Sequence, residues 1–213
     1  LNSTVDQSYH TSPLSAAVEI LWFNGIVVVV SAGNNGTADG PSTIYPPAND
    51  PFVITVGASE DKGTAGLADD TLAVFSAYGM TVDGFAKPEI VAPGRNIVAP
   101  LADKASTVYE AHPLHRVGDY YFRMSGTSMA APVVSGVVAM LLQDEPNLTP
   151  DQVKYRLTAT ASQNWNYDPT QAGAGYLDAY AAVHGTSTQK VSPGVPPNRM
   201  LIKMAILAVY AMN

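Results

Sequence analysis

A run of β-branched residues near the start of the chain most constrains what this sequence can fold into. Residues Ile26-Val27-Val28-Val29-Val30 are all apolar, whereas a strand with one solvent-facing side alternates apolar and polar residues. The run therefore predicts a strand that is covered on both faces, as in the parallel sheets of α/β proteins. Such a central strand needs a neighbour on each of its edges.

Two later segments supply neighbours for this strand. Phe52 to Gly57 and Glu89 to Val91 are short apolar runs bounded by loops rich in Gly, Pro, Asn and Asp, which is typical of strands. Both extend the sheet on one edge of the first strand. We therefore expect something else to cover the other edge: a segment outside this chain, a second copy of the chain, or the tail Met200–Tyr210.

Three helices are indicated by their end signals and their periodicity. Ser12-Pro13 supplies an N-cap and a first-turn proline for a helix that Asn24-Gly25 ends, and its apolar positions are Leu14, Ala17, Val18, Leu21 and Trp22. From Met129 to Gln143 the pattern is apolar nearly all round, which predicts a helix through the interior. Thr149-Pro150-Asp151-Gln152 forms a capping box that opens a surface helix.

Composition bounds the class of protein. The chain has 213 residues, of which 46% are hydrophobic and 14% charged, so it can bury the core of one α/β domain. A net charge of −7 offers no basic surface to a phosphate backbone and counts against nucleic-acid binding. The absence of cysteine excludes disulfides and thiolate metal sites.

The end of the chain differs from the rest. We expect the domain to occupy residues 1–184 and to be followed by a linker, residues 185–199, which is rich in Ser, Thr, Pro and Gly. Residues 200–213 form an apolar tail, for which self-association is the preferred interpretation. Lys203 interrupts the tail, which is too short to cross a bilayer. No membrane span is predicted.

A nine-residue segment carries the strongest sign of chemistry. In Met124-Ser125-Gly126-Thr127-Ser128-Met129-Ala130-Ala131-Pro132, Gly126 permits a close backbone approach and Ser128 lies at the entrance of the predicted buried helix. The first amides of a helix have no partner within it, so they tolerate proline and can stabilise negative charge beside Ser128. The alternative is an ordinary N-cap serine.

The segment from Gly126 to Pro132 resembles the nucleophile signature of the subtilase family. The run from Val27 to Gly36, Val-Val-Val-Val-Ser-Ala-Gly-Asn-Asn-Gly, is similar to the strand and loop that carry the family's oxyanion asparagine. Further segments match the family in the same order, so the resemblance covers roughly residues 10–183: Tyr45-Pro46, Ile54 to Ala58, Phe75 to Gly79 and Lys87 to Gly94.

The resemblance implies a fold and a set of roles. The fold is α/β, a three-layer subtilisin-like parallel sheet flanked by helices, present only in part because the N-terminal strands are missing. Ser128 would be the nucleophile and Asn34 an oxyanion donor in the cleavage of peptide or ester bonds through an acyl-enzyme. Ser31, Ala32, Gly33 and Thr127 would bind the substrate. From the residues alone, Asn34 follows a predicted buried strand at the edge of the sheet where ligands bind, and the alternative is a turn asparagine.

The family's catalytic Asp and His precede the nucleophile in the order Asp, His, Ser, and this sequence begins too late to contain either. None of the four histidines, His10, His112, His115 and His184, stands in a similar motif. We therefore expect an N-terminal fragment carrying Asp and His, or a homo-oligomer. Two alternatives stay open: a stand-alone esterase with His112 or His115 as its base, and a catalytically inert binding module.

No cofactor and no metal are expected. Many subtilases bind calcium, but the acidic and amide residues of the loops here lack an EF-hand pattern: Asp39, Asn49, Asp50, Asp69 and Asp70. By analogy with the family, the protein is expected to be secreted or extracellular, although the sequence begins at Leu1 without a signal-peptide pattern.

Overall fold

The computed structural model describes residues 2–163, 168–191, 194–201 and 203–204. Its core is a parallel sheet in the order β1 (Val29–Ser31), β2 (Ile54–Glu60), β6 (Ile90–Pro93). The short strand β3 (Thr71–Leu72) pairs antiparallel with the end of β2. The parallel arrangement predicted from the uninterrupted apolar runs is confirmed.

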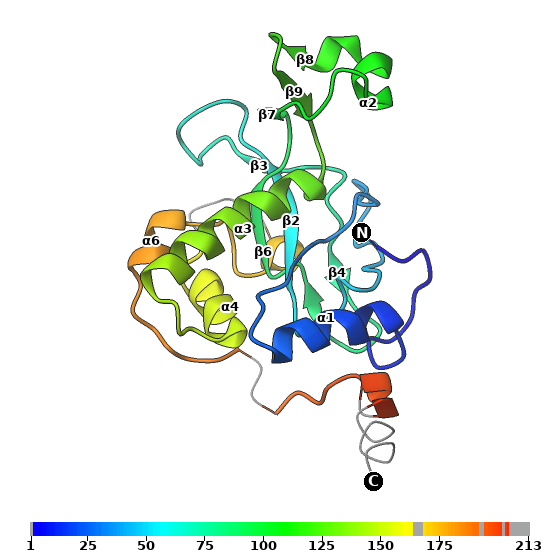
Figure 1. Ribbon diagram of the computed structural model, residues 1–213, viewed down its shortest axis with the longest axis vertical. Helices are drawn as coiled ribbons and strands as arrows, with labels where there is room; N and C mark the ends of the chain where they lie inside the picture. Colours follow the sequence, from blue (N-terminus) through cyan, green and yellow to red (C-terminus); the bar gives the residue numbers. More distant parts are fainter. Residues whose placement is uncertain (1, 164–167, 192–193, 202, 205–213) are drawn as a thin grey trace.

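Helices cover both faces of the sheet, which gives three layers (Figure 1). On one face lies α3 (Thr127–Asp144), which packs on all three parallel strands, with α4 (Pro150–Ala159) and α6 (Ala179–His184) beyond it. On the other face Val18 of α1 (Pro13–Phe23) packs against a second apolar cluster. Its buried members are Val30, Ala32, Ile44, Ala48, Val53 and Ala77.

The two edges of the sheet differ. The outer edge of β6, here called the covered edge, is closed by a later segment: Val91 N donates to Gly175 O (2.9 Å), and Leu177 N donates to Val91 O (2.9 Å). The outer edge of β1, the open edge, has no strand partner among the described residues. The strand predicted to be central is therefore an edge strand, three residues long, in this chain.

Helix α3 is exposed along one side beside the open edge. Pro132, Ser135, Gly136, Ala139 and Met140 are exposed, whereas the side toward the sheet is buried. The prediction that this helix lies wholly in the interior is wrong, because nothing in the described chain covers that side. By length and composition α3 could cross a membrane, but its buried side packs on the sheet. Most of the tail lies outside the described residues.

Helix α1 begins and ends as predicted, with Ser12 Oγ accepting from Ser15 N at 3.2 Å. Its buried face, however, is not the apolar stripe in the sequence. Ser15 and Glu19 are buried, whereas of the predicted stripe only Trp22 is buried, and Leu21 is 42% exposed. The apolar stripe did not predict the buried face of α1, because the residues that cover Ser15 and Glu19 come from distant parts of the chain.

Glu19 forms a buried carboxyl pair with Asp50 and also contacts a residue of the predicted linker. Asn198 is fully buried; its N–H donates to both carboxyl oxygens of Glu19 (3.0 and 2.7 Å), and its side chain donates to the carbonyls of Tyr9 and Ser12. The division at residues 184 and 199 stays a prediction, but this part of the linker docks on α1.

A charge cluster lies next to the covered edge. Glu89 accepts from the ammonium groups of Lys87 and Lys154 and from Thr55 N (2.7 Å). Burial alone would raise the pKa of Glu89, but the two lysines lower it below its usual range. Burial, opposed by Glu89, lowers the pKa of Lys87 to about 8. The cluster ties β6 to α4 in the interior.

An arm projects from the end of the domain at which α3 begins (Figure 1). It consists of a three-stranded sheet, β7 (Ile97–Pro100), β9 (Tyr121–Met124) and β8 (Arg116–Val117), with α2 (Thr107–Ala111) and a 3-10 turn (Pro113–His115) at its outer end. The remaining elements are the hairpin β4 (Gly79–Met80) and β5 (Ala86–Lys87), and α5 (Pro169–Ala172).

Candidate active site

Asn34 follows the carboxyl end of β1, the end of a parallel sheet at which ligands usually bind. The strand stops at Ser31, and Ala32 N still donates to Val56 O of β2 at 2.9 Å. The chain then leaves the sheet, so that Asn34 is exposed and faces the start of α3.

Thr127 fixes the orientation of the Asn34 amide. Asn34 Oδ1 accepts from both Thr127 N and Thr127 Oγ1, each at 2.9 Å. The same hydroxyl oxygen accepts from Gly33 N at 3.2 Å, and Thr127 is only 1% exposed. With Oδ1 held in this way, the Nδ2 group of Asn34 is the end of the amide left for another acceptor, and it has none among the described residues.

Ser128 occupies the first turn of α3, immediately after Thr127. In the described chain neither its hydroxyl nor its backbone N–H has a hydrogen-bond partner, whereas Met129 N donates to Gly126 O at 2.9 Å. A Cβ on Gly126 would lie 3.2 Å from Asn34 Nδ2, a tight contact, so a glycine at this position lets the loop pass close to the amide. Two unengaged N–H donors and an exposed hydroxyl therefore meet at the helix entrance.

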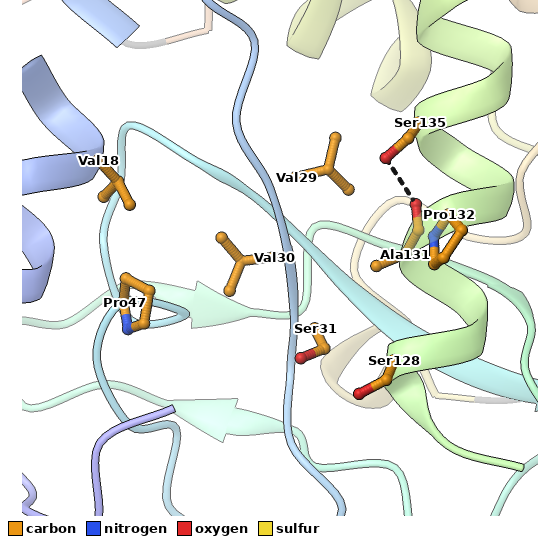
Figure 2. Close-up of a pocket in the computed structure, with 9 residues that line it drawn as sticks. All are labelled: Val18, Val29, Val30, Ser31, Pro47, Ser128, Ala131, Pro132 and Ser135. Carbon is orange, nitrogen blue, oxygen red and sulfur yellow. Dashed lines mark hydrogen bonds between the residues drawn. The ribbon is translucent and has the colours of Figure 1, made fainter. Parts of the chain in front are cut away.

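A groove of about 520 Å³ runs from this point along the open edge. Figure 2 shows Ser31 and Ser128 at one end of it, with Val30 and Pro132 further along. Its lining is mostly apolar, because it is formed by the uncovered sides of β1 and α3. Sequence reasoning missed the groove, although small residues recur at helical spacing on that side of α3.

The structure places the predicted substrate-binding residues at two depths. Ser31 lines the groove, and Gly33 is buried where its N–H reaches Thr127. The side chain of Ala32 is fully buried in the apolar cluster on the other face of the sheet. Thr127 is also buried, and its hydroxyl is already engaged by Gly33 and Asn34. Substrate contact through these four residues stays a prediction.

The two histidines considered as surrogate bases lie on the arm. His112 is the residue before the 3-10 turn and His115 ends it, and both are exposed. His115 Nδ1 is 3.0 Å from Arg123 O, so that ring is engaged on β9. Among the described residues no hydrogen bond links either imidazole to Ser128.

No group of three or more His, Asp or Glu residues gathers as metal ligands within the described part of the chain. Of the residues considered for calcium, Asn49 and Asp50 are fully buried. Asp50 Oδ1 accepts from Phe52 N at 2.7 Å. Burial raises the pKa of Asp50 to about 6. Both side chains serve the packing of the loop before β2.

A layered parallel sheet, with an exposed serine at the entrance of its covering helix and a pinned asparagine amide beside it, has the architecture of an α/β serine hydrolase. The chain belongs to the subtilase family, whose model matches residues 3–188. The resemblance stated from the sequence is confirmed.

Relatives and solved structures agree with this assignment. The chain is 47% identical over 174 residues to the serine protease AprX of Bacillus subtilis, covering 81% of this chain and 38% of that protein. It is 32% identical to subtilisin DY of Bacillus licheniformis, covering 85% and 56%. The crystal structure of fervidolysin from Fervidobacterium pennivorans, a keratinolytic enzyme related to subtilisin, matches with a TM-score of 0.65 at 35% identity, covering 82% of this chain and 25% of that one.

Proposed function

We propose that this chain carries the nucleophile and oxyanion site of a subtilisin-type serine protease. The observation that carries the proposal is the pair of unengaged donors, Ser128 N–H and Asn34 Nδ2, beside the free Ser128 hydroxyl. Donors fixed before the reaction stabilise the charge that develops on a carbonyl oxygen without paying for reorganisation. Thr127 supplies this fixation by holding Asn34 Oδ1.

The reaction would be acyl transfer. Ser128 Oγ attacks the carbonyl carbon of a peptide or ester, its proton passes to a base, and the carbonyl oxygen becomes an oxyanion between the two donors. Collapse of this intermediate expels the amine or alcohol and leaves an acyl-enzyme on Ser128, which water hydrolyses. Ser31, Ala32 and Gly33 border the acyl side of the site.

The base and its orienting carboxylate would come from another polypeptide segment. The chain spans 38% of AprX and 56% of subtilisin DY, and the groove along the open edge adjoins Ser128 directly. An N-terminal segment carrying Asp and His would add a strand to β1 and cover the exposed side of α3. A second copy of the chain is the alternative occupant. By family analogy, the protein would act outside the cell.

A fluorophosphonate probe tests the nucleophile. We expect the chain to be labelled at Ser128 once a segment carrying the base is supplied, and more slowly without that segment. Mass spectrometry of the labelled peptide locates the site, and Ser128→Ala should abolish the label. Ser135→Ala is the matched control, since Ser135 lies in the same groove but its hydroxyl donates to Ala131 O at 3.0 Å. Absence of label on the chain, with or without added N-terminal segment, would favour the inert binding module.

Replacing the oxyanion donor gives a second test. Asn34→Leu is expected to slow labelling or ester turnover by about two to three orders of magnitude, which is the loss measured when such a donor is removed from a subtilisin. Circular dichroism would check that the variant still folds. Equal rates for the variant and the parent would contradict the role assigned to Asn34.

The stand-alone esterase makes a different prediction. If His112 or His115 acts as the base, the chain alone hydrolyses nitrophenyl esters, and His112→Ala or His115→Ala reduces that rate. If the base comes from an added segment, both variants keep the rate of the parent, and casein is cleaved only after the segment is supplied.

A further inference from the structure

Two imidazole rings lie next to each other at the outer end of the arm. A mechanism whose base comes from another segment leaves both without a role. The ring centres of His112 and His115 are 5.4 Å apart, and their planes are inclined by 39°. Both side chains are exposed, so an ion in the solvent can reach them. No hydrogen bond to a described residue occupies the ring of His112.

The turn between the two histidines is short and stiff. His115 N donates to His112 O at 3.0 Å and closes the 3-10 turn Pro113–His115. In such a turn the side chains of residues i and i+3 eclipse each other, and Pro113 fixes one of the backbone angles between them. The two rings are therefore placed on the same side of the turn before any ligand arrives.

A hydrogen bond to the backbone of β9 selects the free nitrogen of His115. Its Nδ1 atom is 3.0 Å from Arg123 O, and because a carbonyl oxygen can only accept, Nδ1 carries the proton. In the neutral ring this leaves a lone pair on Nε2. Metal-binding histidines almost always have such a partner, which orients the ring and makes the free nitrogen more basic. The ring of Phe122, centred 5.8 Å away, borders His115 as well.

The separation of the two rings matches that of two imidazoles bound to one ion. A zinc–nitrogen bond is about 2.0–2.1 Å long, and the centre of the ring lies about 1 Å behind the nitrogen. At the tetrahedral angle the centres of two such rings are about 5 Å apart, close to the 5.4 Å between His112 and His115. The backbone therefore needs no rearrangement for both rings to bind the same ion.

The surroundings of the pair indicate which ions it would take. The neighbouring cation, Arg116, is already engaged, since its Nε and Nη2 donate to Tyr109 O at 3.0 and 2.7 Å and its guanidinium lies over the Tyr109 ring. Among the described residues no third His, Asp or Glu joins the two rings, so a bound ion keeps positions open to water. Imidazole ligands suit Zn²⁺, Ni²⁺ and Cu²⁺, whereas Mg²⁺ and Ca²⁺ prefer oxygen ligands.

We propose that His112 and His115 form a two-ligand site for a divalent transition-metal ion on the arm. The site gives the two histidines a role other than that of a catalytic base, and it does not depend on the chemistry proposed for Ser128. A bound ion would hold the 3-10 turn against β9, because His115 is joined to that strand through Arg123 O.

Isothermal titration calorimetry with ZnCl₂ tests the site, with the whole chain prepared without a histidine tag and freed of metal by EDTA. We expect one Zn²⁺ to bind per chain. His112→Ala or His115→Ala should weaken binding by at least about tenfold, since loss of even an outer-shell partner costs about 10–100-fold. His184→Ala is the matched control and should leave the affinity unchanged, because His184 is exposed on α6 and its ring lies beside Tyr180.

Nuclear magnetic resonance of the ring nitrogens gives an independent readout on the parent chain. In a long-range ¹H–¹⁵N spectrum, Zn²⁺ should shift Nε2 of His115 while Nδ1 keeps its proton, and it should shift one nitrogen of His112. Equal affinity in the parent and both alanine variants, equally tight binding of MgCl₂, or Zn²⁺ that leaves both rings unshifted would each overturn the site. None of these outcomes changes the labelling of Ser128, so the proposed function is tested separately.

Discussion

The two edges of the central sheet carry the same kind of strand in different surroundings. At the covered edge, residues 175–177 supply hydrogen bonds to Val91, and the buried charges nearby have opposite signs: Glu89 lies between Lys87 and Lys154. At the open edge, β1 has an unpaired side among the described residues. The buried carboxyl pair, Glu19 of α1 and Asp50, is not confined to that edge, since Lys87 Nζ donates to Asp50 O at 2.6 Å. The covered edge is paired within this chain, whereas the outer side of β1 has no strand partner among the described residues.

Hydrogen bonds show which backbone groups the open edge leaves unused. Val28 O accepts from Ile54 N, and Ala32 N donates to Val56 O, so alternate residues of β1 face β2. The amides and carbonyls of Val29 and Ser31 therefore point outward, ready to pair with an added strand. The comparison predicts that substitutions at the covered edge change mainly the free energy of unfolding. Substitutions beside the open edge should change mainly association and activity.

The largest effect is expected from breaking the covered edge. Glu89→Gln would remove the carboxylate that forms ion pairs with both buried lysines, Lys87 and Lys154, and breaking a buried pair in this way costs about 3–5 kcal/mol in the free energy of unfolding. Urea denaturation measures this loss in the free energy of unfolding. Asp119→Asn is the control, because Asp119 and Lys104 form an exposed pair at 3.6 Å, and such pairs contribute about 0–1 kcal/mol. Equal losses in the two variants would contradict the role given to the buried cluster.

A smaller effect is expected from pH at the carboxyl pair. Burial, followed by the charge of Asp50, raises the pKa of Glu19 to about 8 from 4.5. Folding therefore favours the protonated acid, so this contribution to stability is complete below about pH 4 and is lost as pH rises through 8. Relative to Glu19→Gln, the parent should lose on the order of 3 kcal/mol between pH 5 and 8.

Subtracting the Glu19→Gln profile removes the titration of the other charged groups around the pair, which are Asp83, Lys87 and Lys154 together with the Tyr9 hydroxyl. Hydrogen exchange at the amides of Asn198 and Arg199 would show whether the docked segment loosens over the same pH range. If the free energy of unfolding changes with pH by the same amount in the parent and in Glu19→Gln, the pKa of Glu19 is not raised.

The smallest effect on stability is expected at the exposed side of α3. Met140→Lys, at a position 49% exposed, should change the free energy of unfolding by less than about 0.5 kcal/mol. It should nevertheless weaken binding of an N-terminal segment or of a second copy, which sedimentation velocity would detect. Tyr180→Lys, on α6 and 77% exposed, is the control. The same association constant for both variants and the parent would show that this side is not an interface.

Local signals in the sequence were sufficient for several elements. The Ser12 cap, the Thr149 capping box and the apolar runs of β2 and β6 depend on neighbours within a few residues, so they could be predicted. The buried face of α1 could not, because Glu19 and Ser15 are covered by parts of the chain 30 to 180 positions away. The family motif pointed to Ser128 and Asn34 and assigned Thr127 to substrate binding, whereas the hydrogen bonds of Thr127 to Gly33 and Asn34 are visible only in the fold.

The hydrogen bonds between Thr127 and the Gly33–Asn34 turn have a consequence for when the chain becomes reactive. They join residues 93 and 94 positions apart, and contacts of such separation form late because the intervening loop must close first. A nascent or misfolded chain thus carries an ordinary serine hydroxyl with no oriented amide beside it. On the proposed function, hydrolytic capacity would arise only once the chain has folded, so the reactive site would not exist during synthesis.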